Sequence, residues 1–369
     1  MTILVIADDL TGAAEIGGIA LRNGLSVEIV HTLAKPTNKD VQILNTNTRS
    51  MRADDVIIHL RKLFAADFSY CWDWIYLKFD SALRGHIVAE ISFYREVLQK
   101  DRVVFCPVNP ALGRVIANGL YWVEGKPIAE TDFARDPEFP IRKSGVLAAI
   151  GAESWVLAKD VPTAPNGDIP YTVAAVGDVD DLNRWAASSK SFGMYAGAAA
   201  FFEALLHHRM PTVSSSVENE PLPKLPLLYV CGSNHAHSIK RVKNLHTDNV
   251  IYWLDIGQEE ELARDICQKI SRVGSVAFAA KPLQRMEARV IRTSMAQVVA
   301  FVQQNCAVQE LLIEGGATAR AVLEALGIDT LWPVWVYGQG VIRNHVPGTT
   351  WTVTLKPGSY PWTDKLWVF

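Results

Sequence analysis

The stretch Ile3-Leu4-Val5-Ile6-Ala7-Asp8-Asp9-Leu10-Thr11-Gly12 decides the fold class. Its apolar first half predicts a buried strand, and the residues from Leu10 to Arg22 follow a helical pattern that ends at Asn23-Gly24, a common helix C-terminal signal. A strand that leads through a short polar turn into a helix is typical of α/β proteins with parallel sheets. The two adjacent carboxylates therefore stand at a strand end, where ligands bind in such folds.

The same strand–turn–helix order recurs along the chain. Strands are predicted at Val41–Leu44, Trp74–Lys78, Val103–Phe105, Leu227–Val230, Leu311–Ile313 and Trp351–Leu355, and helices at His86–Gln99, His235–Leu245 and Ala319–Leu326. We therefore expect an α/β fold of two domains, each with a mostly parallel sheet flanked by helices, and an active site in the cleft between them.

The domain boundary is predicted from a change in composition. Residues 209–225 are rich in proline, serine and acid and have little to bury, which favours a linker. It separates an N-terminal domain at 1–208 from a C-terminal domain at 226–369. Residues around Tyr121–Ile128 are predicted to form a hairpin excursion from the first domain.

Composition narrows the class of protein. The 369 residues are 49% hydrophobic and carry a net charge of −3, so no basic field predicts binding to nucleic acid. The five cysteines include no C-x-x-C pair, which fits a reduced cytoplasmic protein better than a disulfide framework or a zinc site. The first residues lack the basic start of a signal peptide, and no uncharged apolar run reaches the roughly 18 residues of a membrane span. We expect a cytoplasmic globular protein without nucleic-acid or membrane partners; the sequence leaves open whether it forms a homodimer.

The acid pair Asp8-Asp9 has three interpretations. One acid could cap the helix that follows, but a cap needs only one carboxylate. The pair could be a phosphohydrolase nucleophile motif of the D-x-D type, although adjacent residues in an extended chain point to opposite sides. The remaining interpretation has one acid capping the helix or binding substrate hydroxyls while the other accepts a proton. We favour Asp9 as the proton acceptor.

A cationic turn follows the predicted strand Trp74–Lys78. The stretch Lys78-Phe79-Asp80-Ser81-Ala82-Leu83-Arg84-Gly85-His86 puts a cation at a helix start, where it opposes the helix dipole unless an anion binds there. A surface salt bridge among Lys78, Asp80 and Arg84 is the alternative. Arg49, Asn109 and Arg114 lie in turns after other predicted strands. Together these groups would suit a small, hydroxylated anion, either an acid sugar or a phosphorylated sugar.

The C-terminal domain has glycine turns instead. Gly232-Ser233, Gly315-Gly316-Ala317-Thr318 and Lys356-Pro357-Gly358 each follow a predicted strand, and such turns let phosphate approach backbone N–H groups. They predict a nucleotide site, although neither a P-loop nor a dinucleotide fingerprint is present. His235 and His237 are two residues apart without a third ligand nearby, so we predict no metal site.

Several stretches of this chain also occur, in the same order, in a known family. They are A-D-D-L-T-G-A (Ala7–Ala13), T-R-S (Thr48–Ser50), K-F-D-S-A-L-R-G (Lys78–Gly85), C-P-V-N-P-A-L-G-R (Cys106–Arg114), C-G-S (Cys231–Ser233), E-G-G-A-T-A (Glu314–Ala319) and L-K-P-G-S (Leu355–Ser359). Through them the chain resembles the four-carbon acid sugar kinase family, long described as a domain of unknown function.

The resemblance implies ATP-dependent phosphorylation of the terminal hydroxyl of threonate, erythronate or a 3-oxo-tetronate. It implies a substrate-binding N-terminal domain and a nucleotide-binding C-terminal domain, with Mg²⁺ arriving on ATP. By motif, the substrate would contact Asp9, Arg49, Lys78, Asp80 and Ser81, with Arg84 nearby, and ATP would contact Ser233, Gly315, Gly316, Ala317, Thr318, Ala319 and Gly358. Two rival functions stay open at this point: a sugar-acid lyase or isomerase, and a non-catalytic sensor of a sugar acid or nucleotide.

Overall fold

The computed structural model describes residues 2–33, 37–64, 72–136, 138–161, 169–188, 192–210, 220–233, 235–245, 250–253, 257–280, 287–358, 360–367 and 369. It divides into two units: Met1–Ser26 with Thr32–Ser214, and Val27–His31 with Ser215–Phe369. Most of the predicted linker, residues 211–219, lies outside the described residues, as does Ser359 of the last glycine turn.

The first unit contains a parallel sheet whose strands lie in the order β3-β1-β4-β11-β5-β10-β9. In chain order these strands are β1 (Ile3–Ala7), β3 (Val41–Asn45), β4 (Trp74–Lys78), β5 (Val103–Cys106), β9 (Val156–Ala158), β10 (Tyr171–Ala174) and β11 (Met194–Gly197). Every residue of β1, β3 and β4 is buried, which explains why these strands have no polar alternation: helices cover both faces of a parallel sheet.

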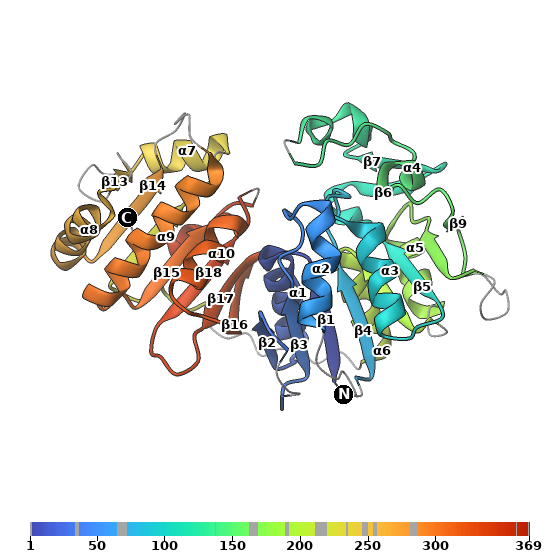
Figure 1. Cartoon of the computed structure of the whole chain (residues 1–369), viewed down its shortest axis with the longest axis horizontal. Coiled ribbons are helices and arrows are strands. Elements are labelled where there is room, and N and C mark those ends of the chain that lie inside the picture. Colours follow the sequence, from blue (N-terminus) through green and yellow to red (C-terminus); the bar gives the residue numbers. More distant parts are fainter. Residues whose placement is uncertain are drawn as a thin grey trace. The chain divides into compact units, whose positions relative to one another are not determined.

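Helices of the first unit form two packed groups (Figure 1). One group is α1 (Leu10–Arg22), α6 (Ala199–Arg209) and α5 (Val179–Ser188); the other is α2 (Ala53–Leu63) and α3 (Ile87–Val97), and the short α4 (Val146–Ile150) lies in the later part of the unit. The strands β6 (Arg114–Ala117), β7 (Leu120–Val123) and β8 (Lys126–Pro127) form a small antiparallel sheet, followed by the 3-10 turns η2 (Ile128–Glu130) and η3 (Asp132–Arg135). This small sheet includes the hairpin that the sequence predicts.

The second unit contains a mixed sheet in the order β13-β14-β12-β15-β18-β17-β16-β2. Its strands are β12 (Leu227–Cys231), β13 (Val250–Trp253), β14 (Ser275–Ala280), β15 (Glu310–Glu314), β18 (Thr352–Lys356), which run parallel, and β17 (Val341–His345) and β16 (Thr330–Gly338), which run antiparallel. Helices α8 (Glu259–Val273), α9 (Ala288–Asn305) and α10 (Gly316–Ala325) pack in series, while α7 (Ala236–Lys243) shares an apolar cluster with Trp362 and Leu366 of the C-terminal tail. The α/β class with mostly parallel sheets is confirmed.

One strand departs from the predicted domain boundaries. The strand β2 (Val27–Val30) pairs antiparallel with β16 and belongs to the second unit, although the predicted boundary assigns it to the first domain. The pairing joins Val30 to Thr330 and Ile29 to Leu331, and all of β2 is buried. A local sequence pattern cannot predict this exchange, because β2 is separated from its partner by some 300 positions of chain.

Candidate functional site

The polar turns of the first unit begin at one edge of its sheet. Ala7, the last residue of β1, lies opposite Asn45 at the end of β3 and opposite Lys78 at the end of β4. Since these strands are parallel neighbours, the turns that follow them start side by side. The structure therefore brings together the predicted acids, Arg49 and the cationic turn.

Arg49 joins the two adjacent acids. Its Nε and Nη2 donate to the two carboxylate oxygens of Asp8 at 2.9 and 2.6 Å, and its Nη1 lies 2.7 Å from Asp9 Oδ2. Asp9 also caps α1, because its Oδ1 accepts a hydrogen bond from the backbone N–H of Gly12 at 2.8 Å. Adjacent carboxylates were expected to point apart; the broad fork of one guanidinium nevertheless reaches both.

The two acids differ in their surroundings. The side chain of Asp8 is fully buried, whereas 18% of the Asp9 side chain is exposed. Burial raises the pKa of Asp8 above its ordinary value, and Arg49 opposes that shift. Burial would lower the pKa of Arg49, but Asp8 and Asp9 hold it well above its ordinary value, so the guanidinium stays charged. Asp8 is thus an enclosed ion-pair partner, and Asp9 is the acid that a ligand can reach.

Lys78 is buried and faces α1. Its Nζ lies 3.3 Å from Glu15 Oε2 and donates to the carbonyl of Phe79 at 3.1 Å. Sequence reasoning did not single out Glu15; the available signal was one acid in an otherwise small and apolar helix, L-T-G-A-A-E-I-G-G-I-A. The predicted alternative of a Lys78–Asp80–Arg84 salt bridge is therefore wrong for Lys78, because Glu15 is its partner.

Asp80 and Arg84 do pair, with Arg84 Nε 2.5 Å from Asp80 Oδ2. Burial would raise the pKa of Asp80, but Arg84 and Arg49 hold it well below its usual range, so the carboxylate stays ionised. The side chain of Arg84 is 34% exposed, more than Arg49 or Lys78. Among these three predicted cations Arg84 is thus the most accessible to a ligand.

The turn that carries these groups has a constrained backbone. Leu83 has φ +61° and Gly85 has φ +100°. A positive φ is energetically unfavourable for Leu83, because its side chain is bulky. A non-glycine residue keeps such a backbone angle only where the surrounding structure enforces it, often at functional sites. A Cβ on Gly85 would lie 3.0 Å from Asp8 Oδ2. Glycine at this position lets the cationic turn pack directly against the buried acid.

Ser81, Asn109 and Arg114 are also brought together. Arg114 Nη1 donates to Ser81 Oγ at 2.5 Å, and Asn109 is bridged to Arg114 through its backbone. Tyr121, which sequence reasoning missed, donates to the carbonyls of Ser81 and Pro107 at 2.6 and 3.0 Å. Through Arg114 and Tyr121, the small antiparallel sheet holds Ser81 of the cationic turn in place. The hairpin predicted around Tyr121–Ile128 was the available sequence signal for such a role.

Further acids of this unit were also missed. Asp136 Oδ2 lies 3.3 Å from Arg84 Nη1, and Glu138 accepts a hydrogen bond from Ser50 at 2.6 Å. Glu90, buried on α3, accepts from Thr48 at 2.9 Å; burial, with a contribution from Asp8, raises the pKa of Glu90 to about 8. Each of these contacts, with Arg84, Ser50 and Thr48, joins residues that are distant in sequence, so spacing could not indicate them.

The glycine turns of the second unit lie side by side as well, because β12, β15 and β18 are neighbours. The Gly232 N–H donates to the Glu314 carbonyl at 3.1 Å, and the Gly315 N–H donates to the Lys356 carbonyl at 2.9 Å. A Cβ on Gly358 would lie 2.9 Å from Ser233 Oγ. The structure therefore gathers the predicted nucleotide-binding turns at one sheet edge.

The turn after β15 differs in detail from the prediction. Helix α10 begins at Gly316 rather than Ala319, with Gly315 at φ +102° before it. Ala317 is exposed, whereas Thr318 and Ala319 are buried, and the Thr318 side chain packs where a Cβ of Gly232 would be. The Ala319 N–H donates to the Gly315 carbonyl at 2.9 Å and is therefore not available to a phosphate. Thr318 can offer only its backbone N–H, together with those of Gly316 and Ala317 at the start of α10.

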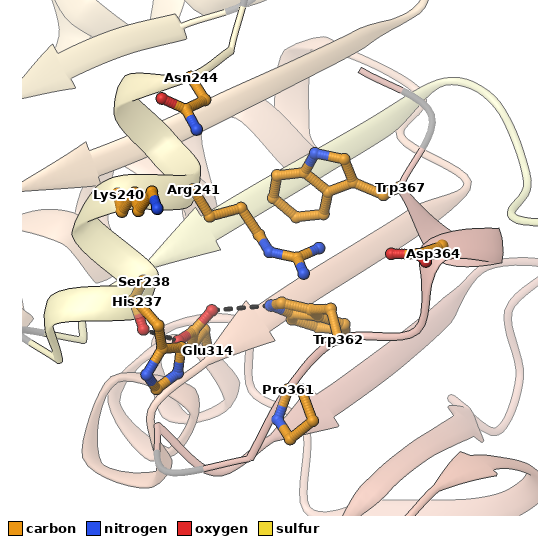
Figure 2. A pocket seen from close by; sticks show the side chains of 10 residues that line it. All are labelled: His237, Ser238, Lys240, Arg241, Asn244, Glu314, Pro361, Trp362, Asp364 and Trp367. Atoms are coloured by element: carbon orange, nitrogen blue, oxygen red, sulfur yellow. Dashed lines mark hydrogen bonds between the residues drawn. The ribbon is translucent and has the colours of Figure 1, made fainter.

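Beside these turns lies a buried ion pair that sequence reasoning did not single out. Lys356 Nζ is 3.0 Å from Glu314 Oε1, and both side chains are completely buried. Glu314 also accepts hydrogen bonds from Tyr229 at 2.6 Å, from Ser238, and from the indole of Trp362 at 2.7 Å. Figure 2 shows Glu314 beside Ser238 and Trp362. Burial would raise the pKa of Glu314, but Lys356 and these donors hold it below its ordinary value. The carboxylate is therefore ionised and saturated with donors.

Metal ligands do not cluster in the part of the chain that the structure describes: no group of three His, Cys, Asp or Glu side chains is placed to hold an ion. The rings of His235 and His237 stack 5.6 Å apart. Among the described residues, no helix is both long and apolar enough to span a membrane.

Comparison with known proteins identifies relatives. A family model described as "Sugar-binding N-terminal domain" matches residues 3–205. The chain is 27% identical to the D-threonate kinase of Salmonella typhimurium over 80% of this chain and 72% of that protein. It is 28% identical to the D-erythronate kinase of Heliobacterium modesticaldum over 44% of this chain and 38% of that protein. It is 29% identical to the 3-oxo-tetronate kinase of Brucella melitensis over 42% of this chain and 37% of that protein.

Two crystal structures share the fold. A protein from Salmonella typhimurium LT2 superposes with a TM-score of 0.80 at 17% identity, covering 98% of this chain and 96% of that one. A Haemophilus influenzae protein of the family named DUF1537 superposes with a TM-score of 0.71 at 18% identity, covering 98% of both chains. At these identities the likeness concerns the fold alone.

Proposed function

Because the chain belongs to the family with a sugar-binding N-terminal domain, we propose that it is an ATP-dependent kinase that phosphorylates the terminal hydroxyl of a four-carbon acid sugar. The predicted resemblance to the four-carbon acid sugar kinases is confirmed by relatives named for threonate, erythronate and 3-oxo-tetronate. The observation that carries the proposal is the sharing of Arg49 by Asp8 and Asp9 beside the Lys78–Arg84 turn.

Arg84 is the proposed anchor of the substrate carboxylate. It is partly exposed, stays charged beside Asp80, and has a planar fork that matches a carboxylate. Asp80 pairs with Arg84, and Ser81 of the same turn accepts from Arg114, which is bridged to Asn109; all three residues have groups that can bind hydroxyls. A polyhydroxy acid supplies both a carboxylate for Arg84 and hydroxyls for these groups, whereas a neutral sugar supplies only the hydroxyls.

Asp9 is the proposed acceptor of the hydroxyl proton. Phosphoryl transfer is mainly a matter of positioning and charge stabilisation, together with a group that orients the attacking hydroxyl. Asp8 is enclosed and bound by Nε and Nη2 of Arg49, whereas Asp9 is partly exposed and fixed in direction by the Gly12 N–H. Arg49 and Lys78 would offset negative charge near the reacting hydroxyl without leaving their acidic partners.

The nucleotide is proposed to bind the second unit at Ser233, Gly358 and the backbone of Gly315–Ala319. Within that stretch the N–H groups of Gly315 and Ala319 already donate to backbone carbonyls, so those of Gly316, Ala317 and Thr318 would face the phosphate oxygens, and Gly358 leaves space that a Cβ would fill. The carboxylate nearest these turns, Glu314, is occupied by its donors and does not fit a metal ligand. We therefore expect Mg²⁺ to be held by the phosphates of ATP. A cytoplasmic location stays a prediction from the cysteine pattern.

The direct test is ADP release with MgATP and a panel of C4 to C6 sugar acids. Turnover is expected with a four-carbon acid and not with the corresponding neutral sugars. Asp9→Asn preserves the helix cap, since asparagine also caps well, and is expected to lower kcat by about 10²- to 10⁴-fold. Full kcat in Asp9→Asn would remove the proton-acceptor assignment. Conversion of a sugar acid without nucleotide would favour a lyase or isomerase, and ATP binding without ADP release would favour a sensor.

A further inference from the structure

A cavity of about 520 Å³ lies beside helix α7 in the second unit. Its lining residues are His237, Ser238, Lys240, Arg241, Asn244, Glu314, Pro361, Trp362, Asp364 and Trp367. Figure 2 shows α7 on one side of it and the C-terminal tail on the other. The volume lies within the roughly 300–1,000 Å³ that is usual for small-molecule pockets.

The α7 side of the cavity is one face of the helix. His237, Lys240, Arg241 and Asn244 recur at intervals of three and four residues, so their side chains project in the same direction. Among the described residues, Arg241 has no carboxylate partner and the side-chain amide of Asn244 makes no hydrogen bond. A cation without an acidic partner and an amide without a hydrogen bond, as far as the described residues go, therefore border the same space.

The tail side contributes aromatic surface and an acid. The guanidinium of Arg241 lies over the ring of Trp367, 4.7 Å from its centroid. Such a pair, here called the Arg241–Trp367 platform, is a surface on which a purine base can stack, since bases stack on aromatic rings and on guanidinium planes. Asp364 is exposed at the rim, and a carboxylate in such a place can accept hydrogen bonds from ribose hydroxyls.

Two lining residues of the cavity adjoin the predicted phosphate-binding turns. Ser238 lines the cavity, and its Oγ lies 3.1 Å from Ser233 Oγ in the turn after β12. Glu314 lines it too and is followed directly by Gly315. A ligand with phosphates on the glycine turns would thus reach the cavity with the part attached to them.

We propose that the cavity between α7 and residues 361–367 binds the nucleoside part of ATP, with the base on the Arg241–Trp367 platform and its edge read by Asn244. The pairing of an amide with adenine is bidentate, because the amide donates to N7 and accepts from N6. The site therefore favours adenine over a 6-oxopurine. This assignment rests on the proposed kinase function, because that function supplies the nucleotide.

The test is calorimetric binding of ADP, IDP and inorganic tripolyphosphate to the full chain. Arg241→Ala is expected to weaken ADP binding by about tenfold, as for the loss of one stacking contact, while tripolyphosphate binding changes by less than about twofold. Lys243→Ala is the matched control, because Lys243 is an exposed cation of the same helix that does not line the cavity. Asn244→Ala, an exposed substitution that should not affect folding, is expected to remove most of the preference for ADP over IDP.

The outcomes separate this proposal from the kinase proposal. Equal ADP affinity in the wild type, Arg241→Ala and Asn244→Ala would overturn the nucleoside site and leave the kinase proposal standing. Equal weakening of ADP and tripolyphosphate by Arg241→Ala would also overturn it, because the cation would then act on phosphate. If the wild type bound neither ADP nor ATP, both proposals would fall together.

Discussion

Arg49 donates to the two carboxylate oxygens of Asp8 through Nε and Nη2, at 2.9 and 2.6 Å, and its Nη1 lies 2.7 Å from Asp9 Oδ2. One cation therefore serves two acids that stand in different environments. Without Arg49, two adjacent carboxylates at a buried strand end would repel each other and one would take up a proton. The arrangement keeps a charged acid accessible at the end of β1 and ties the turn after β3 to it.

Replacing Asp8 should affect stability first. Asp8→Ala leaves a buried guanidinium without its principal partner, and breaking such a pair costs about 3–5 kcal/mol. We expect a lower midpoint in urea unfolding at unchanged slope. Asp54→Asn on the exposed start of α2 is the control and should stay within about 0.5 kcal/mol of the wild type. Wild-type stability in Asp8→Ala would show that Asp9 alone suffices for Arg49.

Gly85 tests the contact between the cationic turn and Asp8. An alanine there meets Asp8 Oδ2 at 3.0 Å and also adopts φ +100°. Gly125→Ala is a matched control, because φ is +77° there and nothing in the described part of the chain lies within 4 Å of a Cβ. Both substitutions should cost about 1 kcal/mol through the backbone, but only Gly85→Ala should lower kcat/KM for the acid sugar, by about tenfold. Equal activities would mean that the close approach to Asp8 has no part in substrate binding.

Glu90 makes stability depend on pH. Its pKa is raised to about 8 in the fold, so in the pH range from its ordinary value to about 8 the unfolded chain binds fewer protons than the folded one. This group therefore stabilises the fold least at high pH: stability falls as pH rises through that range, by at most about 1.4 kcal/mol per pH unit, and falls no further above it.

The measurement is urea unfolding of the wild type and Glu90→Gln at pH 5, 6, 7 and 8. Glutamine keeps a neutral partner for Thr48, so the variant should gain on the wild type as pH rises. Glu96→Gln, an exposed acid of the same helix, should run parallel to the wild type. A constant difference between Glu90→Gln and the wild type across this range would mean that Glu90 does not titrate there.

Local patterns explain most of what could be predicted. The continuous apolar runs of β1 and β4 and the turn residues after them predict strands, helices and the sheet edge that carries the site. Pairings across the chain could not be predicted: Lys78 with Glu15, Arg84 with Asp136, and β2 with β16. Each depends on which elements become neighbours in space, and a single sequence contains no signal for that. The cap by Asp9 was among the predicted alternatives, whereas its sharing of Arg49 required the order β3-β1-β4.

Asp136 should compete with the substrate for Arg84. The Asp136 carboxylate lies 3.3 Å from Arg84 Nη1, and the side chain of Arg84 is 34% exposed. An ion pair this exposed contributes at most about 1 kcal/mol, and neutralising Asp136 removes that competition with the substrate carboxylate. We expect Asp136→Asn to lower KM for the acid sugar by about two- to fivefold with kcat unchanged. Asp132→Asn is the control, since Asp132 is exposed at the start of η3, the 3-10 turn that ends just before Asp136, and forms no ion pair within the described part of the chain. A raised KM in Asp136→Asn would instead mean that Asp136 holds Arg84 in its binding position. The substrate would then lose more affinity from a misplaced Arg84 than it gains from the removal of a competing carboxylate.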